Sequence, residues 1–254
     1  MPASSLMLVR DQAARAGINL FGLVDAARFD RCQPKERRLG NVLRGCGTAV
    51  VLGTAGRGLL QAQAGLPVGR EAGDARALAA VRATAMASRS VGPCTLVLAG
   101  VDTPVNFARL GEAAGFGAVS PVSGLFLHPE FGPWLRVRAA LLFPGYPFGA
   151  IAEASIADRF HPCCSCARPC LTACPAAALD GAGGQRLGQC EQHRLDGGCE
   201  LVCCSRQACP LGADHQDAPQ LPLHGHDCAV KRRVFRVFAW LRRVTLVVRG
   251  RPPG

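Results

Sequence analysis

The distribution of cysteines is the feature that most constrains this chain. Of its 14 cysteines, ten lie in the stretch between Cys163 and Cys209. The other four stand apart, at Cys32, Cys46, Cys94 and Cys228. Thiols at this density are paired in disulfides, bound to a metal or used in redox chemistry, and the cellular compartment decides between these roles.

The N-terminal sequence predicts a cytoplasmic protein. The first ten residues, MPASSLMLVR, have no basic flank followed by a sustained apolar core, so we expect no signal peptide. The sequence has no run of about 18 apolar residues, so we expect no membrane span. Stable disulfides are rare in the cytosol. The clustered thiols are therefore expected to bind a metal or to serve redox chemistry.

The spacing of the clustered cysteines favours iron–sulfur ligation. The first half of the segment ends in Cys170-Leu-Thr-Ala-Cys174-Pro175, and the second half ends in Cys209-Pro210. Bacterial-type ferredoxins use C-x2-C-x2-C-x3-C-P, in which the fourth thiolate crosses to the other cluster in two-cluster proteins. Four thiols from each half predict one or two [4Fe–4S] clusters, with two thiols to spare. The predicted ligands are Cys163, Cys166, Cys170, Cys174, Cys190, Cys199, Cys203 and Cys209.

Zinc is the main alternative to an iron–sulfur cluster at these cysteines, and a role without any metal is a further alternative. Three residues separate Cys166 from Cys170, where the ferredoxin pattern has two. The adjacent pairs Cys163/Cys164 and Cys203/Cys204 leave the choice of ligand open. Four-cysteine zinc sites also use short paired spacings, but their usual mark is two C-x2-C knuckles, of which one is clear here.

The first 150 residues predict an α/β (α+β) domain in which helices and strands alternate. Apolar periodicity indicates helices at 7–16 and 71–89, and a proline near the start and a glycine past the end indicate a helix at 103–114. Another helix is expected after the glycine-rich residues 53–58. Short apolar runs predict strands at 19–24, 49–52 and 95–99.

The segment 125–142 gives the sharpest strand signal. Leu125–His128 leads into Pro-Glu-Phe-Gly-Pro, and Trp134–Leu142 follows. Arg136 and Arg138 alternate with apolar residues. This pattern predicts a β-hairpin that turns at Pro129–Pro133, with one face buried and the other in solvent.

Two stretches of the chain, together with the cysteine motifs, resemble a known superfamily. Residues 114–137, AGFGAVSPVSGLFLHPEFGPWLRV, followed by two Cys-Pro motifs, are similar to the corrinoid-dependent reductases, which include epoxyqueuosine reductases and reductive dehalogenases. Residues 48–60 and 123–145 also resemble the vitamin B12-processing decyanase, which lacks the clusters. The tRNA-binding helical repeats of full-length epoxyqueuosine reductases have no counterpart here.

The resemblance implies a nitroreductase-like, corrinoid-binding domain at 1–150 and a ferredoxin-like cluster module at 151–230, and the composition adds a basic tail at 231–254. It also implies a cobalamin. Asp102, in Val-Asp-Thr-Pro, matches the position of the family's catalytic Asp and is the candidate proton donor; its alternative role is the N-cap of a helix that begins near Pro104. The candidate cofactor contacts lie in the hairpin and are His128, Pro129, Glu130 and Gly132. A lone histidine there is more often simply hydrogen-bonded.

The positive charge of the chain is concentrated in its tail. The formal net charge is +11, and residues 231–254 contain eight basic and no acidic side chains. The folded body therefore gives no indication of nucleic-acid binding. Arginines interleaved with Phe, Trp and Val predict a basic amphipathic helix, which could lie on a membrane surface, contact RNA phosphates or cover the core. Residues 244–248 could instead form a strand.

Three functions follow from the sequence. The leading one is an iron–sulfur reductase that contains cobalamin and receives electrons from a donor such as a flavodoxin or a ferredoxin. The second is a ferredoxin-type electron carrier without catalysis of its own. The third is a zinc-stabilised protein that binds RNA or a membrane surface.

Overall fold

The structure is a computed structural model, and it describes residues 2–56, 70–100, 104–152, 154, 156, 159–199 and 203–216. Three sequence predictions lie outside the described residues: Asp102, the helix expected after residue 58 and the basic tail 231–254. The domain boundaries near residues 150 and 230 stay predictions.

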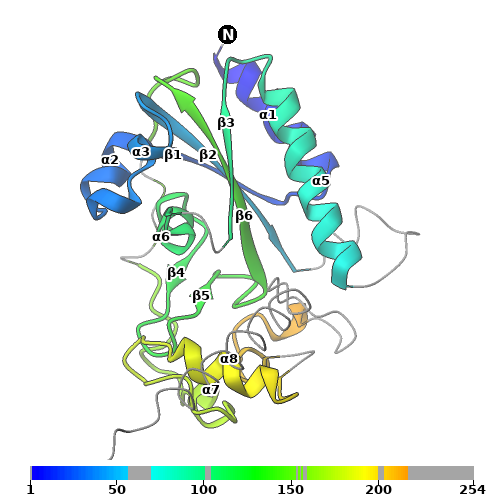
Figure 1. Cartoon of the computed structure of the whole chain (residues 1–254), viewed down its shortest axis with the longest axis vertical. Helices are drawn as coiled ribbons and strands as arrows, with labels where there is room; N and C mark the ends of the chain where they lie inside the picture. Colours follow the sequence, from blue (N-terminus) through cyan, green and yellow to red (C-terminus); the bar gives the residue numbers. More distant parts are fainter. Residues whose placement is uncertain are drawn as a thin grey trace, which may run out of the picture.

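A four-stranded antiparallel sheet with the order β1-β2-β6-β3 forms the centre of the protein (Figure 1). Helices on both sides of the sheet confirm the predicted mixture of helices and strands. The strands are β1 Leu20–Asp25, β2 Cys46–Ala55, β3 Thr95–Leu98 and β6 Leu135–Pro144. The helices around the sheet are α1 Pro2–Arg15, α2 Ala26–Arg31, η1 Lys35–Arg37, α3 Leu39–Val42, α5 Arg70–Ser88 and α6 Phe107–Ala113.

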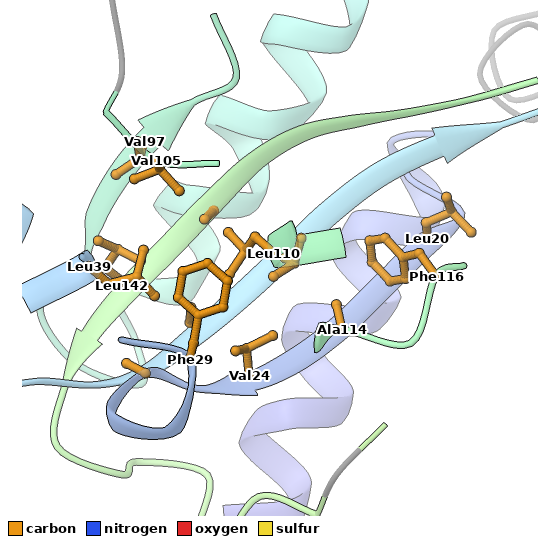
Figure 2. Close-up of a cluster of buried hydrophobic side chains, with 14 of the residues drawn as sticks. Leu20, Val24, Phe29, Leu39, Val97, Val105, Leu110, Ala114, Phe116 and Leu142 are labelled. Carbon is orange, nitrogen blue, oxygen red and sulfur yellow. The ribbon is translucent and has the colours of Figure 1, made fainter. Parts of the chain in front are cut away.

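One face of the sheet packs against α2, α3 and α6 (Figures 1 and 2). Phe29 of α2, Leu39 of α3 and Leu110 of α6 meet alternate residues of the strands, such as Val24 and Leu142. Leu39, Leu110 and Leu142 have no solvent-exposed surface. Burial of these apolar side chains is the main favourable contribution to folding, and it fixes α6 against the sheet.

The opposite face of the sheet packs against α1 and α5, which lie side by side (Figure 1). Ala13 of α1 and Val81 of α5 meet Val50, Leu141 and Phe143. Since both faces are covered, β2 and β6 are apolar along most of their length rather than alternating.

The hairpin predicted at 125–142 is largely wrong. Phe126–Leu127 forms β5 and pairs with β4, Ala118–Val119, whereas β6 pairs with β2 and β3. His128 and Gly132 alone bridge the two arms, through reciprocal backbone hydrogen bonds of 2.9 Å. The expected solvent-facing side of β6 is also wrong, because β6 is an inner strand of a sheet that is covered on both faces.

A bulge in β6 explains why the alternation of arginines was misleading. Leu52 pairs with Ala139 and Gly53 pairs with Val137, so one extra residue, Arg138, lies on β6 between them. Val137 packs on the α6 side, whereas Ala139 belongs to the α1–α5 side. The extra residue thus reverses which face the following side chains occupy.

Helix α6 begins later than the sequence predicted. Its N-cap is Asn106, whose side chain accepts a hydrogen bond of 3.2 Å from the backbone N–H of Arg109. A side-chain amide at this position satisfies an N–H group that has no partner within the helix. The helix expected to begin near Pro104 therefore begins at Phe107, with Asn106 as its N-cap, whereas Asp102 lies outside the described residues.

The cysteine-rich segment lies beyond one end of the sheet, next to β4 and β5 (Figure 1). Its helices are short, and most of its cysteines lie in loops outside them. The helices are α7 Pro169–Thr172, α8 Leu187–Leu195, α9 Cys204–Gln207 and η2 Ala213–His215. Helix α7 contacts α9, which brings the two halves of the segment together.

Candidate functional site

All thirteen cysteines within the described residues are free thiols. Short helices hold three thiols of the cysteine-rich segment: Cys170 lies in α7, Cys190 in α8 and Cys204 at the start of α9. The first of these helices starts with Pro169, which suits the first helical position because its missing N–H would have no partner there.

The first group of thiols contains Cys163, Cys166, Cys170 and Cys209. Burial raises the pKa of the Cys170 thiol, and the neighbouring Cys163 and Cys166 raise it further. Burial also raises the pKa of the Cys209 thiol, and a hydrogen bond from the backbone N–H of Leu211 opposes this shift. The neighbouring Cys170, Cys163 and Cys166 raise the pKa of Cys209 further. Cys209, from the end of the segment, therefore lies with the three cysteines from its beginning.

The second group of thiols contains Cys174, Cys190, Cys199 and Cys203. Burial raises the pKa of Cys190 most strongly, followed by the neighbouring Cys203, with Cys174 and Cys199 contributing further. Burial likewise raises the pKa of Cys199, and Cys174 is among its neighbours. Cys174, the last cysteine of the first motif, thus lies with the cysteines of the second half.

Several of these sulfur atoms accept hydrogen bonds from backbone N–H groups. Arg168 donates to Cys166 at 3.4 Å, and Ala178 donates to Cys174 at 3.3 Å. Ala177 has the left-handed φ of 45°, which non-glycine residues adopt rarely, and it directs the following N–H towards Cys174. Hydrogen bonds to sulfur favour the thiolate, which is the form that binds metals.

The structure separates the two members of each adjacent cysteine pair. Cys163 belongs to the first group, whereas its neighbour Cys164 is exposed. Cys203 lies near Cys190, whereas the exposed Cys204 has its sulfur 3.7 Å from that of Cys199. Cys204 is therefore a spare thiol that lies next to a candidate ligand, Cys199.

A loop between β4 and β5 joins the sheet region to the cysteine-rich segment. Ser120 is 3% exposed, and its Oγ lies 3.2 Å from the Sγ of Cys163. The Gln185 amide donates to the carbonyl of Ser123 at 3.0 Å. Gly124 has a left-handed φ of 66°, and a side chain on it would collide with the carbonyl of Gly183. The close approach of the two backbones thus requires glycine.

The turn that contains the predicted cofactor contacts packs on the end of the cysteine-rich segment. Nδ1 of His128 accepts backbone N–H bonds from Glu130 at 3.0 Å and from Phe131 at 3.2 Å. The ring of Phe131 lies between those of His128 and His215, with centroids 4.7 Å from each. His128 thus has the local hydrogen-bonded role that the sequence left open.

Gly132 lies at the same contact between the His128–Gly132 turn and the end of the cysteine-rich segment, and Trp134 follows this turn. Gly132 has a left-handed φ of 55°, and a side chain there would collide with the carbonyl of Leu211. The glycine is therefore required by the contact with the chain just after Cys209. The indole Nε1 of Trp134 is buried and has no hydrogen-bond acceptor within the part of the chain that the structure describes.

The neighbours that shift the thiol pKa values place the eight predicted ligands in two groups, which differ from their order in the sequence, and their role as ligands stays a prediction. Pro129, Glu130 and Gly132 lie in one turn with His128, whereas Asp102 lies outside the described residues. Sequence reasoning missed Ser120 as a neighbour of Cys163. A serine in an irregular loop carries no pattern that would identify it.

The sequence of this chain matches no protein-family model and no curated protein. Its structure is similar to solved structures of epoxyqueuosine reductases. That of Bacillus subtilis superposes with a TM-score of 0.62 at 15% identity, covering 88% of this chain and 69% of the other. That of Streptococcus thermophilus gives a TM-score of 0.57 at 15% identity, covering 87% of this chain and 69% of the other.

A catabolic reductive dehalogenase, solved with 3-bromo-4-hydroxybenzoic acid, is also similar in structure. It has a TM-score of 0.55 at 14% identity, and the match covers 84% of this chain but 32% of the dehalogenase. The chain therefore has the fold shared by epoxyqueuosine reductases and reductive dehalogenases, as the sequence resemblance predicted. None of the described helices has the length and apolar character needed to cross a bilayer.

Proposed function

We propose that this chain is an iron–sulfur oxidoreductase in which two groups of four cysteines hold two [4Fe–4S] clusters. The observation that carries the proposal is the crossed grouping of the thiols. Cys209, followed by Pro210, lies with the first group, and Cys174, followed by Pro175, lies with the second. Two-cluster ferredoxins exchange the thiolate of the Cys-Pro motif between clusters in this way.

The chemistry of the donors fits clusters better than it fits zinc. Four thiolates around one zinc ion stand about 3.8 Å apart, because each Zn–S bond is about 2.3 Å in a tetrahedral site. Within the described residues, the sulfurs of Cys199 and Cys204 are one pair at such a spacing, 3.7 Å, but no three His, Cys, Asp or Glu side chains converge enough to hold a single ion. Thiolates on a [4Fe–4S] cluster bind four separate irons, so they stand farther apart. Such clusters supply one-electron transfer when bound.

The protein's own residues would keep the thiolates in place and ready to bind. Burial and the mutual repulsion of neighbouring thiolates raise the pKa values of Cys170 and Cys209. Positively charged iron offsets this repulsion. The N–H groups of Arg168 and Ala178 stabilise the negative sulfurs of Cys166 and Cys174.

We propose further that the sheet region binds a cobalamin and that the chain is a reductase. The fold shared with epoxyqueuosine reductases and reductive dehalogenases supports this proposal, and one solved dehalogenase structure is described in terms of B12-dependent dehalogenation. The N–H of Trp134, which has no acceptor among the residues that the structure describes, is a donor that a bound group could use. Asp102 is the proposed proton donor. The turn His128–Gly132, with Pro129 and Glu130, is the proposed contact with the cofactor.

The proposed partner is a small electron donor such as a flavodoxin or a ferredoxin, in the cytoplasm, where thiols stay reduced. The substrate would then be reduced at the sheet region. An epoxyqueuosine reductase has been solved with a tRNA stem loop, which makes a modified nucleoside one candidate substrate.

Anaerobic purification of the full chain tests these proposals. Protein with bound iron and acid-labile sulfide, and with an EPR signal after reduction, is the expected result. Bound corrinoid, measured by absorption spectra before and after the addition of cobalamin, tests the second proposal separately. Colourless protein that contains zinc and takes up no sulfide on reconstitution would refute the cluster proposal.

A further inference from the structure

The hydroxyl of Ser120 has a defined direction. Its Oγ accepts hydrogen bonds from the backbone N–H groups of Val122, at 3.2 Å, and Ser123, at 3.0 Å. A serine hydroxyl has two acceptor positions and one proton to donate. With both acceptor positions filled, the remaining interaction of Ser120 is donation of its proton, and the Sγ of Cys163 lies 3.2 Å away.

The loop around Ser120 fixes this geometry. The backbone N–H of Ser120 donates to the carbonyl of Leu125 at 2.8 Å, and the N–H of Gly124 donates to the carbonyl of Ser120 at 2.9 Å. The side chain is buried, with 3% of its surface exposed. The hydroxyl is therefore held in position and shielded from water, so its hydrogen bond to a negative sulfur is stronger than in water.

We infer that Ser120 sets the reduction potential of the cluster held by Cys163, Cys166, Cys170 and Cys209. This inference rests on the proposed cluster. A hydrogen bond to a ligating sulfur stabilises the reduced state, which carries one more negative charge, and therefore raises the potential. Ser120 acts on the cluster through Cys163, so it is a positioning residue rather than a ligand.

The same bond couples the potential to the packing of the two regions. Ser120 belongs to the loop between β4 and β5, whereas Cys163 belongs to the cysteine-rich segment. Two other bonds cross this contact: Gln185 donates to the carbonyl of Ser123 at 3.0 Å, and Gly183 donates to the carbonyl of Val122 at 3.2 Å. The cluster next to the sheet region thus has its higher potential only when the two regions are packed together.

Redox titration of the reconstituted full chain, followed by EPR, tests the inference. Ser120→Ala is expected to make reduction of one cluster about tenfold less favourable, which moves its midpoint by 59 mV to more negative values for a one-electron couple. The other cluster, held by Cys174, Cys190, Cys199 and Cys203, is an internal control and should keep its potential. Ser120→Thr keeps the hydroxyl and is expected to restore the wild-type value.

Ser123→Ala is the matched control. Ser123 is as buried as Ser120, and its Oγ accepts from the N–H of Leu125 at 3.3 Å, but among the described residues the hydrogen bond to Cys163 comes from Ser120 and not from Ser123. Its loss should leave both potentials unchanged. If Ser120→Ala does not assemble the cluster, Ser120→Cys, whose thiol is a weaker donor, should show a smaller shift in the same direction.

Two results would overturn the inference in distinguishable ways. If both clusters assemble and the potentials of the wild type and the Ser120 variants coincide, Ser120 has no such role and the proposed function stands. If the wild-type chain takes up no cluster on reconstitution, the proposed function and this inference fail together.

Discussion

Two double variants distinguish the crossed grouping of thiols from a grouping by sequence order. Cys163→Ala combined with Cys209→Ala removes two thiols from the first group and leaves the second group complete. Cys163→Ala combined with Cys174→Ala removes one thiol from each group. The two proteins lack the same number of thiols, so any difference between them reports on which cysteines lie together.

The expected iron contents follow from the structure. A chain with two [4Fe–4S] clusters holds about eight irons. The Cys163/Cys209 variant keeps one complete set of four thiols, so it should retain about four irons. The Cys163/Cys174 variant has no complete set, and its iron should fall towards zero. A grouping by sequence order would give the opposite result for the two variants.

Anaerobic reconstitution, with iron and acid-labile sulfide measured per chain, is the assay. The EPR signal of the reduced Cys163/Cys209 variant should be that of a single, magnetically isolated cluster. Cys164→Ala is the control, because this exposed thiol lies outside both groups and its removal should leave about eight irons. About four irons in the Cys163/Cys174 variant, with little in the other, would refute the crossed grouping.

Three further predictions concern the sheet region. Glu112→Ala should lower the free energy of unfolding, measured by urea titration, by about 2–4 kcal/mol, because Glu112 is 8% exposed and accepts a hydrogen bond of 2.7 Å from the N–H of Val119. Glu112→Gln keeps an acceptor, so it should lower the free energy of unfolding by less than half of this amount. Burial lowers the pKa of His128, so folding favours the neutral imidazole and the free energy of unfolding should fall as the pH drops below 6.5. His128→Gln should flatten this pH dependence of stability, and an unchanged dependence would contradict the prediction. Burial raises the pKa of Cys46 to about 11, so at pH 8 about one Cys46 thiol in a thousand is ionised. Iodoacetamide should therefore modify the exposed Cys32 before Cys46, which peptide mass spectrometry would show, and equal labelling of the two would contradict the burial of Cys46.

Much of the α/β body could be predicted from local patterns. The strand at 95–99 and the helix at 71–89 lie within one residue of β3 and α5, because apolar periodicity reports directly on burial. The partner of β6 could not be predicted this way. A neighbouring apolar run and a turn suggested a hairpin, but the bulge at Arg138 and the burial of both faces depend on strands far away in the sequence.

The candidate site shows the same division. Cysteine spacing and the Cys-Pro motifs predicted the eight ligands, an assignment that stays a prediction, and the zinc alternative rested on the same spacing. The ferredoxin motif itself implies that the thiol of each Cys-Pro pair crosses to the other group, whereas the contact between α7 and α9 that joins the two halves of the segment is tertiary. The role of Gly132 was also not readable, since the carbonyl of Leu211 that excludes a side chain there comes from a distant loop.

The exchange of Cys174 and Cys209 between the two groups has a consequence for how the protein is made. During synthesis, Cys163, Cys166 and Cys170 emerge from the ribosome well before Cys209. The first group is therefore incomplete until the whole segment has been translated. Neither half, expressed alone, would contain all four members of either group. Insertion of the proposed first cluster would therefore come late in synthesis, and a stop codon anywhere before residue 209 would leave the first group without its fourth thiol.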